Sequence, residues 1–194
     1  MTSRLMLTLS ATVAIALFLW FSASWARFAI VPYIVTVNFA LMGWAWFVFD
    51  VHRFSLDSRW FDLATFEKGG HIYRFAGLHW FQAIQKFLGW NKLLGVPKIR
   101  MDKDMLERFE HGMRFGEATH WVCLAVLLPI AGWSVISQDG AGLIYWVLSA
   151  IVLHIYPIML QRYNRPRVRR LLAKLTTRQS HLNETDGHQI QIES

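Results

Sequence analysis

The chain has 194 residues, of which 54% are apolar, and a formal net charge of +7. An apolar share above the roughly 45–50% of soluble domains argues against an ordinary soluble protein. The basic residues flank hydrophobic blocks, so membrane lipids with anionic headgroups are the expected partner and nucleic acid is not. The single cysteine, Cys123, lies in such a block and cannot form an internal disulfide.

Two hydrophobic blocks open the chain. Residues 5–21 make about 17 residues, near the lower limit for a membrane span, and residues 28–49 make about 22, which span easily. Residues 23–26 are a weak match to a signal-peptide cleavage site. We expect an uncleaved helix instead, because only Arg4 precedes the first block and the second block follows at once.

Two further blocks cover residues 119–136 and 142–160. Tryptophans lie near several block edges, as an interfacial aromatic belt requires: Trp20, Trp25, Trp121, Trp133 and Trp146. The pattern predicts an all-α polytopic membrane protein with four transmembrane helices in two hairpins. Residues 1–178 then form a single integral-membrane domain. The tail, 179–194, is polar without periodicity and is expected to be disordered.

The segment between the hairpins, residues 51–118, is too long for a structureless connection. Apolar residues form a broad face between Ile72 and Leu88, with Arg, Gln and Lys between them, and a helix of this kind typically lies in the membrane interface. Residues 167–174 show the same pattern. We therefore expect interfacial amphipathic helices between and after the two hairpins.

The distribution of basic residues predicts the orientation. Residues 51–118 hold eleven Lys or Arg and the residues after Leu160 hold seven, whereas the connections 22–27 and 137–141 together hold one. The positive-inside rule then places the central segment and both termini in the cytoplasm. The expected location is the cell (inner) membrane, crossed several times.

A polar stripe leads into the third span. Glu110, Arg114, Glu117 and His120 are spaced three or four residues apart and therefore share one helix face. A carboxylate one turn before an imidazole can orient it as a base, so Glu117 and His120 are the candidate catalytic pair. The alternative is an interfacial pair in contact with water.

His154 lies inside the fourth span, from which it can face His120 across the bundle. The alternative is a histidine that only hydrogen-bonds a neighbouring helix in packing. No bound metal is predicted, because the remaining histidines lack ligand spacing: His52, His71, His79 and His111.

The flank of the fourth span is the run Gln161-Arg162-Tyr163-Asn164-Arg165-Pro166-Arg167. Proline disfavours the helical conformation of the residue before it, so the helix is predicted to end near Asn164. Guanidinium groups can hold phosphate or carboxylate through two parallel donors. The alternative is plain membrane anchoring, for which any Lys or Arg would serve.

These motifs resemble those of a known family, the small membrane acyltransferases typified by glycosyl-4,4'-diaponeurosporenoate acyltransferase, which acts last in staphyloxanthin-type carotenoid synthesis. The run from Gln161 to Arg167 is similar to the family's C-terminal signature, and residues 117–121 are similar to its E-x-x-H-W element. Glu67, Gly70 and Tyr73, followed by Trp90 and Lys92, resemble a third element, although Asn91 separates its Trp and Lys. The resemblance covers about residues 60–172.

The resemblance implies transfer of a fatty acyl group to a hydroxyl of a membrane glycolipid or carotenoid glycoside. The partners would be a lipophilic acceptor and an acyl donor, with acyl-CoA or another donor as co-substrate and no bound cofactor. Such chemistry needs a base and donors for an oxyanion or phosphate. We assign the catalytic role to His120 and Glu117, and substrate binding to Gln161, Arg162, Asn164, Arg165, Arg167, Trp90, Lys92 and His154.

Two other function classes remain open at this point. A small membrane methyltransferase acting on a lipid or prenylated substrate would also need a cytoplasmic polar site beside a helical hairpin. In a non-enzymatic membrane scaffold, the polar stripes would only pack helices.

Overall fold

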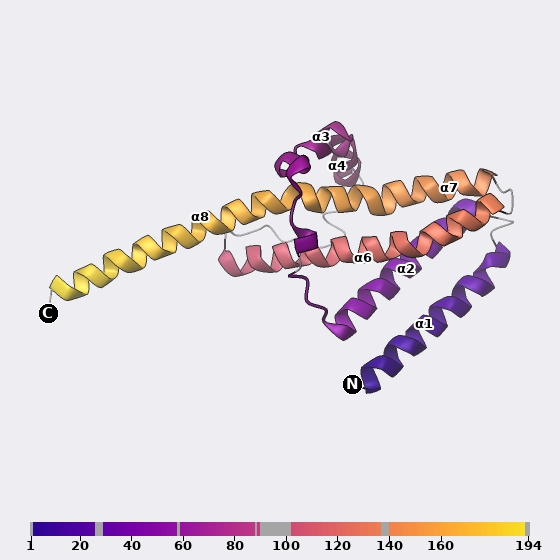
Figure 1. Cartoon of the computed structure of the whole chain (residues 1–194), viewed down its shortest axis with the longest axis horizontal. Helices are drawn as coiled ribbons and strands as arrows, with labels where there is room; N and C mark the ends of the chain where they lie inside the picture. The colour runs from indigo at the N-terminus through magenta and orange to yellow at the C-terminus, as the bar shows by residue number, and fades with distance from the viewer. Residues whose placement is uncertain are drawn as a thin grey trace. The chain divides into compact units, whose positions relative to one another are not determined.

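The computed structural model describes residues 2–25, 29–57, 59–87, 89, 102–136 and 140–192, and all regular secondary structure within these ranges is helical (Figure 1). The longest helices are α1 (Thr2–Ser22), α2 (Ile30–His52), α6 (Lys103–Ile136) and α8 (Tyr156–Ile192). The predicted all-α class is confirmed.

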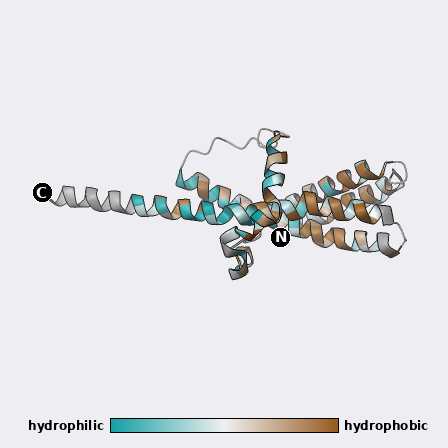
Figure 2. Cartoon of the chain, turned by 90° about the horizontal axis from the view of Figure 1, so that it is seen from above, coloured by the Kyte–Doolittle hydropathy of each residue, from teal (hydrophilic) through white to brown (hydrophobic). Residues whose placement is uncertain are grey.

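Four helical stretches are long and apolar enough to cross a membrane, which confirms the predicted number of spans. They are Thr2–Ser22, Ile30–His52, Lys103–Trp133 and Gly142–Arg178. Figure 2 shows the hydrophobic residues concentrated along long helices, and hydrophilic residues along the part of α8 that leads toward the C-terminus.

The chain divides into two compact units. The first contains Met1–Phe61 and Arg114–Met159, and the second contains Asp62–Met113 and Leu160–Ser194. The boundaries fall inside α6 and α8, so both units draw on the same two helices.

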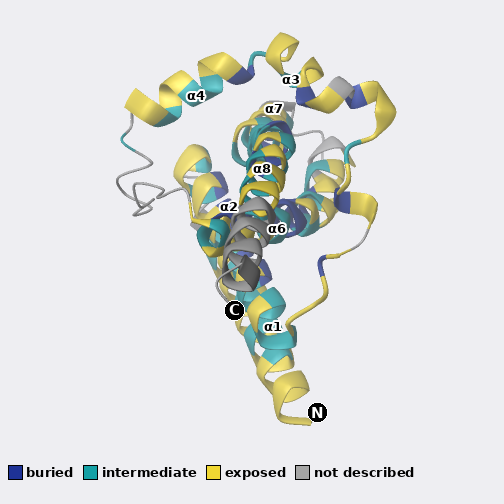
Figure 3. Cartoon of the chain, turned by 90° about the vertical axis from the view of Figure 1, so that its left-hand side faces the viewer, coloured by how far each residue is buried: buried dark blue, intermediate teal, exposed yellow. Residues whose placement is uncertain are grey.

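The core of the first unit joins α2, α6 and α7 (Gly140–Ala150). Tyr33 and Trp146 meet edge to face across it, with ring centroids 6.1 Å apart. Helix α1 packs against α2, and most of its residues are exposed or intermediate (Figure 3). Its large apolar side chains are mostly exposed, as those of lipid-facing helices are. The buried core residues are Ile34, Val37, Leu41, Ala45, Cys123, Leu127 and Trp146.

A π-helical turn, Ile151–Ile155, separates α7 from α8. The N–H of Tyr156 donates to the carbonyl of Ile151, five residues back. Pro157, which has no N–H to donate, follows directly, and a π-turn is one of the ways a helix accommodates such a residue. The predicted fourth span therefore contains an irregular turn, and His154 lies within it.

Helix α8 continues past Pro166, so the predicted helix end near Asn164 is wrong. A proline inside a helix costs about 3 kcal/mol or more. Continuing the helix lets Val168 join a buried cluster with Leu106 and Met113 of α6, and this packing offsets the cost. Further apolar residues of α8 pack on the same cluster: Leu171, Leu172 and Leu175.

At its other end, α8 runs on to Ile192. The sequence predicts a disordered tail for residues 179–194, and this stays a prediction, although the helical assignment of the backbone extends to Ile192. Backbone hydrogen bonds within a helix do not require an apolar periodicity, which was the basis of the prediction.

The second unit also contains a 3₁₀ segment, Thr65–Gly70, and two short helices, α3 (Ile72–Phe75) and α4 (Leu78–Phe87). The sequence predicts one amphipathic stretch here, and the structure breaks it at Gly77, whose φ of 78° is left-handed. The large apolar side chains that project from these elements include Phe66, Phe75, Trp80, Ile84 and Phe87.

Candidate active site

The first unit brings His120 of α6 against His154 of the π-helical turn. Their Nδ1 atoms are 3.1 Å apart, and the rings meet edge to face with centroids separated by 5.3 Å. Only 8% of His120 and 0% of His154 is exposed. The contact that the sequence allowed between these two spans is therefore present.

Asn38 of α2 completes this group. Its Oδ1 lies 2.8 Å from Nε2 of His154, and the asparagine is fully buried. Asn38 is not among the residues predicted from the sequence. A lone amide inside an otherwise apolar span could have indicated it, because polar groups at this depth need partners.

Glu117 is also fully buried, one turn before His120. The indole N–H of Trp121 donates to its Oε1 at 3.5 Å, and Trp121 meets Trp60 edge to face. The sequence pairs Glu117 with His120, whereas the geometry gives the Nδ1 of His120 a partner in His154. The role of Glu117 stays a prediction.

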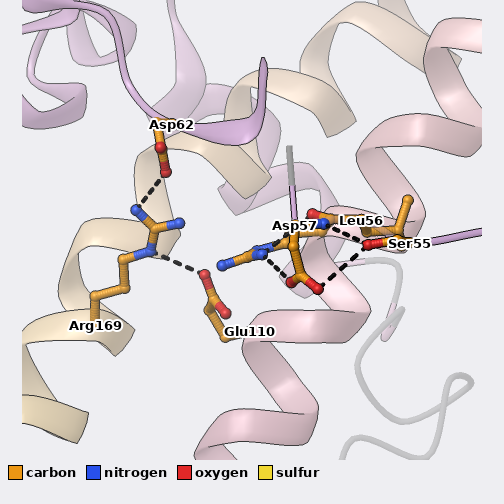
Figure 4. A network of polar contacts seen from close by, with 7 residues as sticks. Ser55, Leu56, Asp57, Asp62, Glu110 and Arg169 are labelled. Atoms are coloured by element: carbon orange, nitrogen blue, oxygen red, sulfur yellow. Dashed lines mark hydrogen bonds and ion pairs between the residues drawn. The ribbon is translucent and has the colours of Figure 1, made fainter. Parts of the chain in front are cut away.

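The other charged members of the predicted stripe contact residues outside α6. In the first unit, Arg114 donates to the carbonyl of Leu56 at 3.1 Å and to the carboxylate of Asp57 at 2.9 Å (Figure 4). In the second unit, Glu110 accepts from Arg169 at 2.9 Å. The same guanidinium donates to Asp62 at 2.8 Å.

Within the second unit, the C-terminal signature docks on the segment that carries Glu67. Arg162 donates to Oε1 of Glu67 through two nitrogens, at 2.7 and 3.2 Å, and Glu67 is only 2% exposed. Gly70, with φ of 90°, faces the backbone of Tyr163. A Cβ added to Gly70 would lie 3.2 Å from the Cα of Tyr163. Burial and then the nearby Glu67 carboxylate raise the pKa of Tyr73 above its ordinary value of 10.0, which keeps its hydroxyl protonated.

This docking explains three positions that otherwise only resemble a motif. Glu67 binds an arginine, Gly70 permits close backbone approach, and Tyr73 lies beside the ion pair. The guanidinium of Arg162 is consequently occupied by a protein carboxylate.

The remaining signature side chains have different surroundings. Arg165 is 1% exposed, whereas Arg167 is exposed and lies over the Tyr163 ring, with its guanidinium carbon 3.5 Å from the centroid. Gln161 and Asn164 are half-buried. Trp90 and Lys92, also predicted to bind substrate, lie outside the described residues. Within the described ranges, no group of three or more His, Cys, Asp or Glu side chains is arranged to hold a metal.

Comparison with known proteins assigns the family. Residues 57–174 match the sequence profile of the glycosyl-4,4'-diaponeurosporenoate acyltransferase family, which is more than half of the chain. No match to this chain was found among curated proteins or among solved structures. The matched residues include both histidines of the buried pair and both members of the Arg162–Glu67 ion pair. The chain belongs to the glycosyl-4,4'-diaponeurosporenoate acyltransferase family and is an acyltransferase.

Proposed function

We propose that this acyltransferase moves a fatty acyl group onto a hydroxyl of a membrane glycolipid, with a carotenoid glycoside as the preferred acceptor class. The family assignment supports the reaction and the acceptor class. Four helices able to cross a membrane support a lipophilic acceptor, which would reach the enzyme through the bilayer.

The single observation that carries the mechanism is the buried His120–His154 pair. Imidazole is the side chain best suited to take a proton near neutral pH, and ionisable groups placed inside apolar spans are costly unless they are used or paired. We assign His120 as the general base, since it also lies in the E-x-x-H-W element.

With acyl-CoA as co-substrate, the step balances without a bound cofactor. His120 takes the proton from the acceptor hydroxyl as its oxygen bonds to the acyl carbonyl carbon. The carbon–sulfur bond of the thioester then breaks, and the imidazolium returns the proton to the departing thiolate. A positioned base contributes typically about 10²–10⁴-fold to such a rate.

Binding of the donor is assigned to the signature of the second unit. Arg167 is exposed and Asn164 half-exposed, so both can meet a phosphate of the donor. Arg162 already binds Glu67, and we assign it to holding the signature in place rather than to the ligand. Gln161, Arg165, Trp90 and Lys92 remain predicted parts of the binding region.

We further propose a multi-pass location in the cell membrane with both termini in the cytoplasm. The motivation is the excess of basic residues in 51–118 and after Leu160. In a Cys123→Ala background, an impermeant thiol reagent added outside cells should label Asp139→Cys and miss Lys92→Cys. The reverse labelling would reject this orientation.

The proposed activity is tested by incubating the purified protein in nanodiscs with a carotenoid glycoside and either labelled acyl-CoA or labelled S-adenosylmethionine. We expect label from acyl-CoA in the acceptor, and loss of that transfer in His120→Gln but not in His111→Gln, which alters an exposed histidine of the same helix. Transfer from S-adenosylmethionine alone, or from neither donor, would contradict the proposal.

A further inference from the structure

A chain of three buried side chains links three helical segments of the first unit. Asn38 comes from α2, His154 from the π-helical turn and His120 from α6. The contacts run from Asn38 Oδ1 to His154 Nε2 at 2.8 Å, and from His154 Nδ1 to His120 Nδ1 at 3.1 Å. The hydrogen positions in these two contacts follow from what the Asn38 amide and each imidazole can donate or accept.

The orientation of the Asn38 amide is fixed by its other contacts. Its Nδ2 donates to the carbonyl of Ile34 at 2.7 Å and to the hydroxyl of Ser149 at 3.3 Å. A carbonyl oxygen only accepts, so the amide nitrogen must face Ile34 and the amide oxygen must face His154. The amide oxygen also only accepts, which places a proton on Nε2 of His154.

The remaining protons follow from this one. A neutral imidazole carries a single N–H, so a proton on Nε2 of His154 leaves its Nδ1 with a lone pair. That lone pair faces Nδ1 of His120, which must then be the donor. His120 consequently keeps its own lone pair on Nε2.

We propose that Asn38 and His154 are positioning residues that hold His120 in the Nδ1–H tautomer, with Nε2 as the basic atom. The catalytic use of that atom rests on the proposed function, whereas the tautomer does not. When Nε2 takes a proton, the Nδ1–H of His120 still donates to His154. A hydrogen bond from a charged donor is the stronger kind, so the contact favours the imidazolium as it forms.

This inference assigns a role to a residue that the family match does not reach, because Asn38 lies outside residues 57–174. It also changes the role of His154 from substrate binding to orientation of the base. Both assignments depend on contacts between helical segments, which a single sequence does not display.

The tautomers can be read directly by nitrogen NMR of the whole protein labelled with ¹⁵N-histidine in nanodiscs, since protonated and unprotonated ring nitrogens have distinct shifts. Spectra of His120→Gln and His154→Gln identify the two residues. We expect a proton on Nδ1 of His120 and on Nε2 of His154 near neutral pH. A proton on Nε2 of His120, or a mixture of its two tautomers, would overturn the inference.

A variant of Ser149 and a variant of Asn38 form a matched pair. Ser149→Ala removes one acceptor of the Asn38 amide nitrogen but leaves its bond to the Ile34 carbonyl, so the amide oxygen still faces His154 and the Nδ1–H tautomer of His120 should be preserved. Asn38→Leu removes that oxygen and should mix the tautomers. It should also lower kcat more than it changes KM, by less than the roughly 10²–10⁴-fold expected for loss of the base itself. Unchanged histidine spectra in Asn38→Leu would show that Asn38 does not set the tautomers of the two histidines.

The two proposals fail in different ways. If the spectra show the expected tautomers but no acyl transfer occurs, the proposed function is wrong and the hydrogen-bond assignment stands. If acyl transfer depends on His120 but its proton lies on Nε2, the assignment is wrong and the function stands.

Discussion

The first unit buries an amide and two imidazoles in one hydrogen-bonded group, whereas the second unit buries an ion pair between Arg162 and Glu67. An imidazole group can gain or lose a proton at physiological pH, and its lone pair is usable in catalysis. A buried arginine–carboxylate pair has its charges satisfied, and breaking it costs stability. The difference supports the proposal that the first unit supplies proton transfer while the ion pair of the second unit maintains structure.

The largest effect is expected from His120→Ala in the first unit. Loss of the base should lower the acyl-transfer rate by about 10²–10⁴-fold. His111→Ala, on an exposed position of the same helix, should leave the rate near that of the wild type. Rates are compared at equal amounts of folded protein. A similar loss in both variants would mean that the effect is not specific to the buried pair.

In the second unit, Glu67→Gln should lower the free energy of unfolding by up to about 3 kcal/mol, because it removes the carboxylate that neutralises the Arg162 guanidinium, whose side chain is only 12% exposed. Thermal unfolding in detergent measures this. The control is Glu107→Gln, which removes a half-exposed carboxylate 3.9 Å from Lys103 and should cost less than about 1 kcal/mol.

A double variant tests whether Glu67 and Arg162 stabilise each other. Glu67→Leu combined with Arg162→Met removes both charges, and should be less destabilising than either single change. Strictly additive losses would show that the two side chains do not stabilise each other.

The exposed part of the signature should respond in activity rather than in stability. If Arg167 grips a phosphate through two parallel donors, Arg167→Lys loses the bidentate contact, at about 1.5–3 kcal/mol or roughly 10–100-fold in kcat/KM. Asn164→Ala should have a comparable effect without any change of charge. Arg170→Lys, at another exposed position of α8, is the matched control. Wild-type kinetics in both test variants would mean that the signature only anchors the helix at the membrane and binds no ligand.

A smaller structural effect is expected at Gly70. Gly70→Ala places a methyl group 3.2 Å from the Cα of Tyr163 on a backbone with φ of 90°, and should cost about 1–3 kcal/mol of stability. At Gly69 the φ of 65° is also left-handed, but among the described residues no atom beyond Gly69 and its two chain neighbours lies within 4 Å of the added carbon. Gly69→Ala should therefore be the milder change, and a larger loss there would contradict the docking described for Gly70.

Hydrophobic block length was enough to predict the four spans, because crossing a membrane requires a long apolar helix whatever its neighbours are. The helix end near Asn164 could not be predicted correctly from Pro166. The local preference of proline is overridden by burial of Val168 against Leu106, and that contact joins residues far apart in the sequence.

At the candidate site, too, contacts between distant segments could not be predicted from the sequence. His120 and His154 were identifiable as polar residues in or near apolar blocks, and helical spacing allowed them to meet. Nothing in the sequence paired Glu67 with Arg162, or Asn38 with His154, because both contacts are made between distant segments. Motif positions were therefore visible in the sequence, while their contacts required the structure.

The most direct test measures acyl-transfer rate and unfolding temperature together for His120→Ala and Glu67→Gln. The account predicts that His120→Ala loses the rate while the protein stays folded in the membrane. It predicts that Glu67→Gln lowers the unfolding temperature and keeps kcat per folded molecule at saturating donor, because the signature that the ion pair holds in place only binds the donor. A catalytically competent His120→Ala, or a Glu67→Gln protein that unfolds like the wild type, would contradict the assignment of chemistry to the buried histidines and of structure to the buried ion pair.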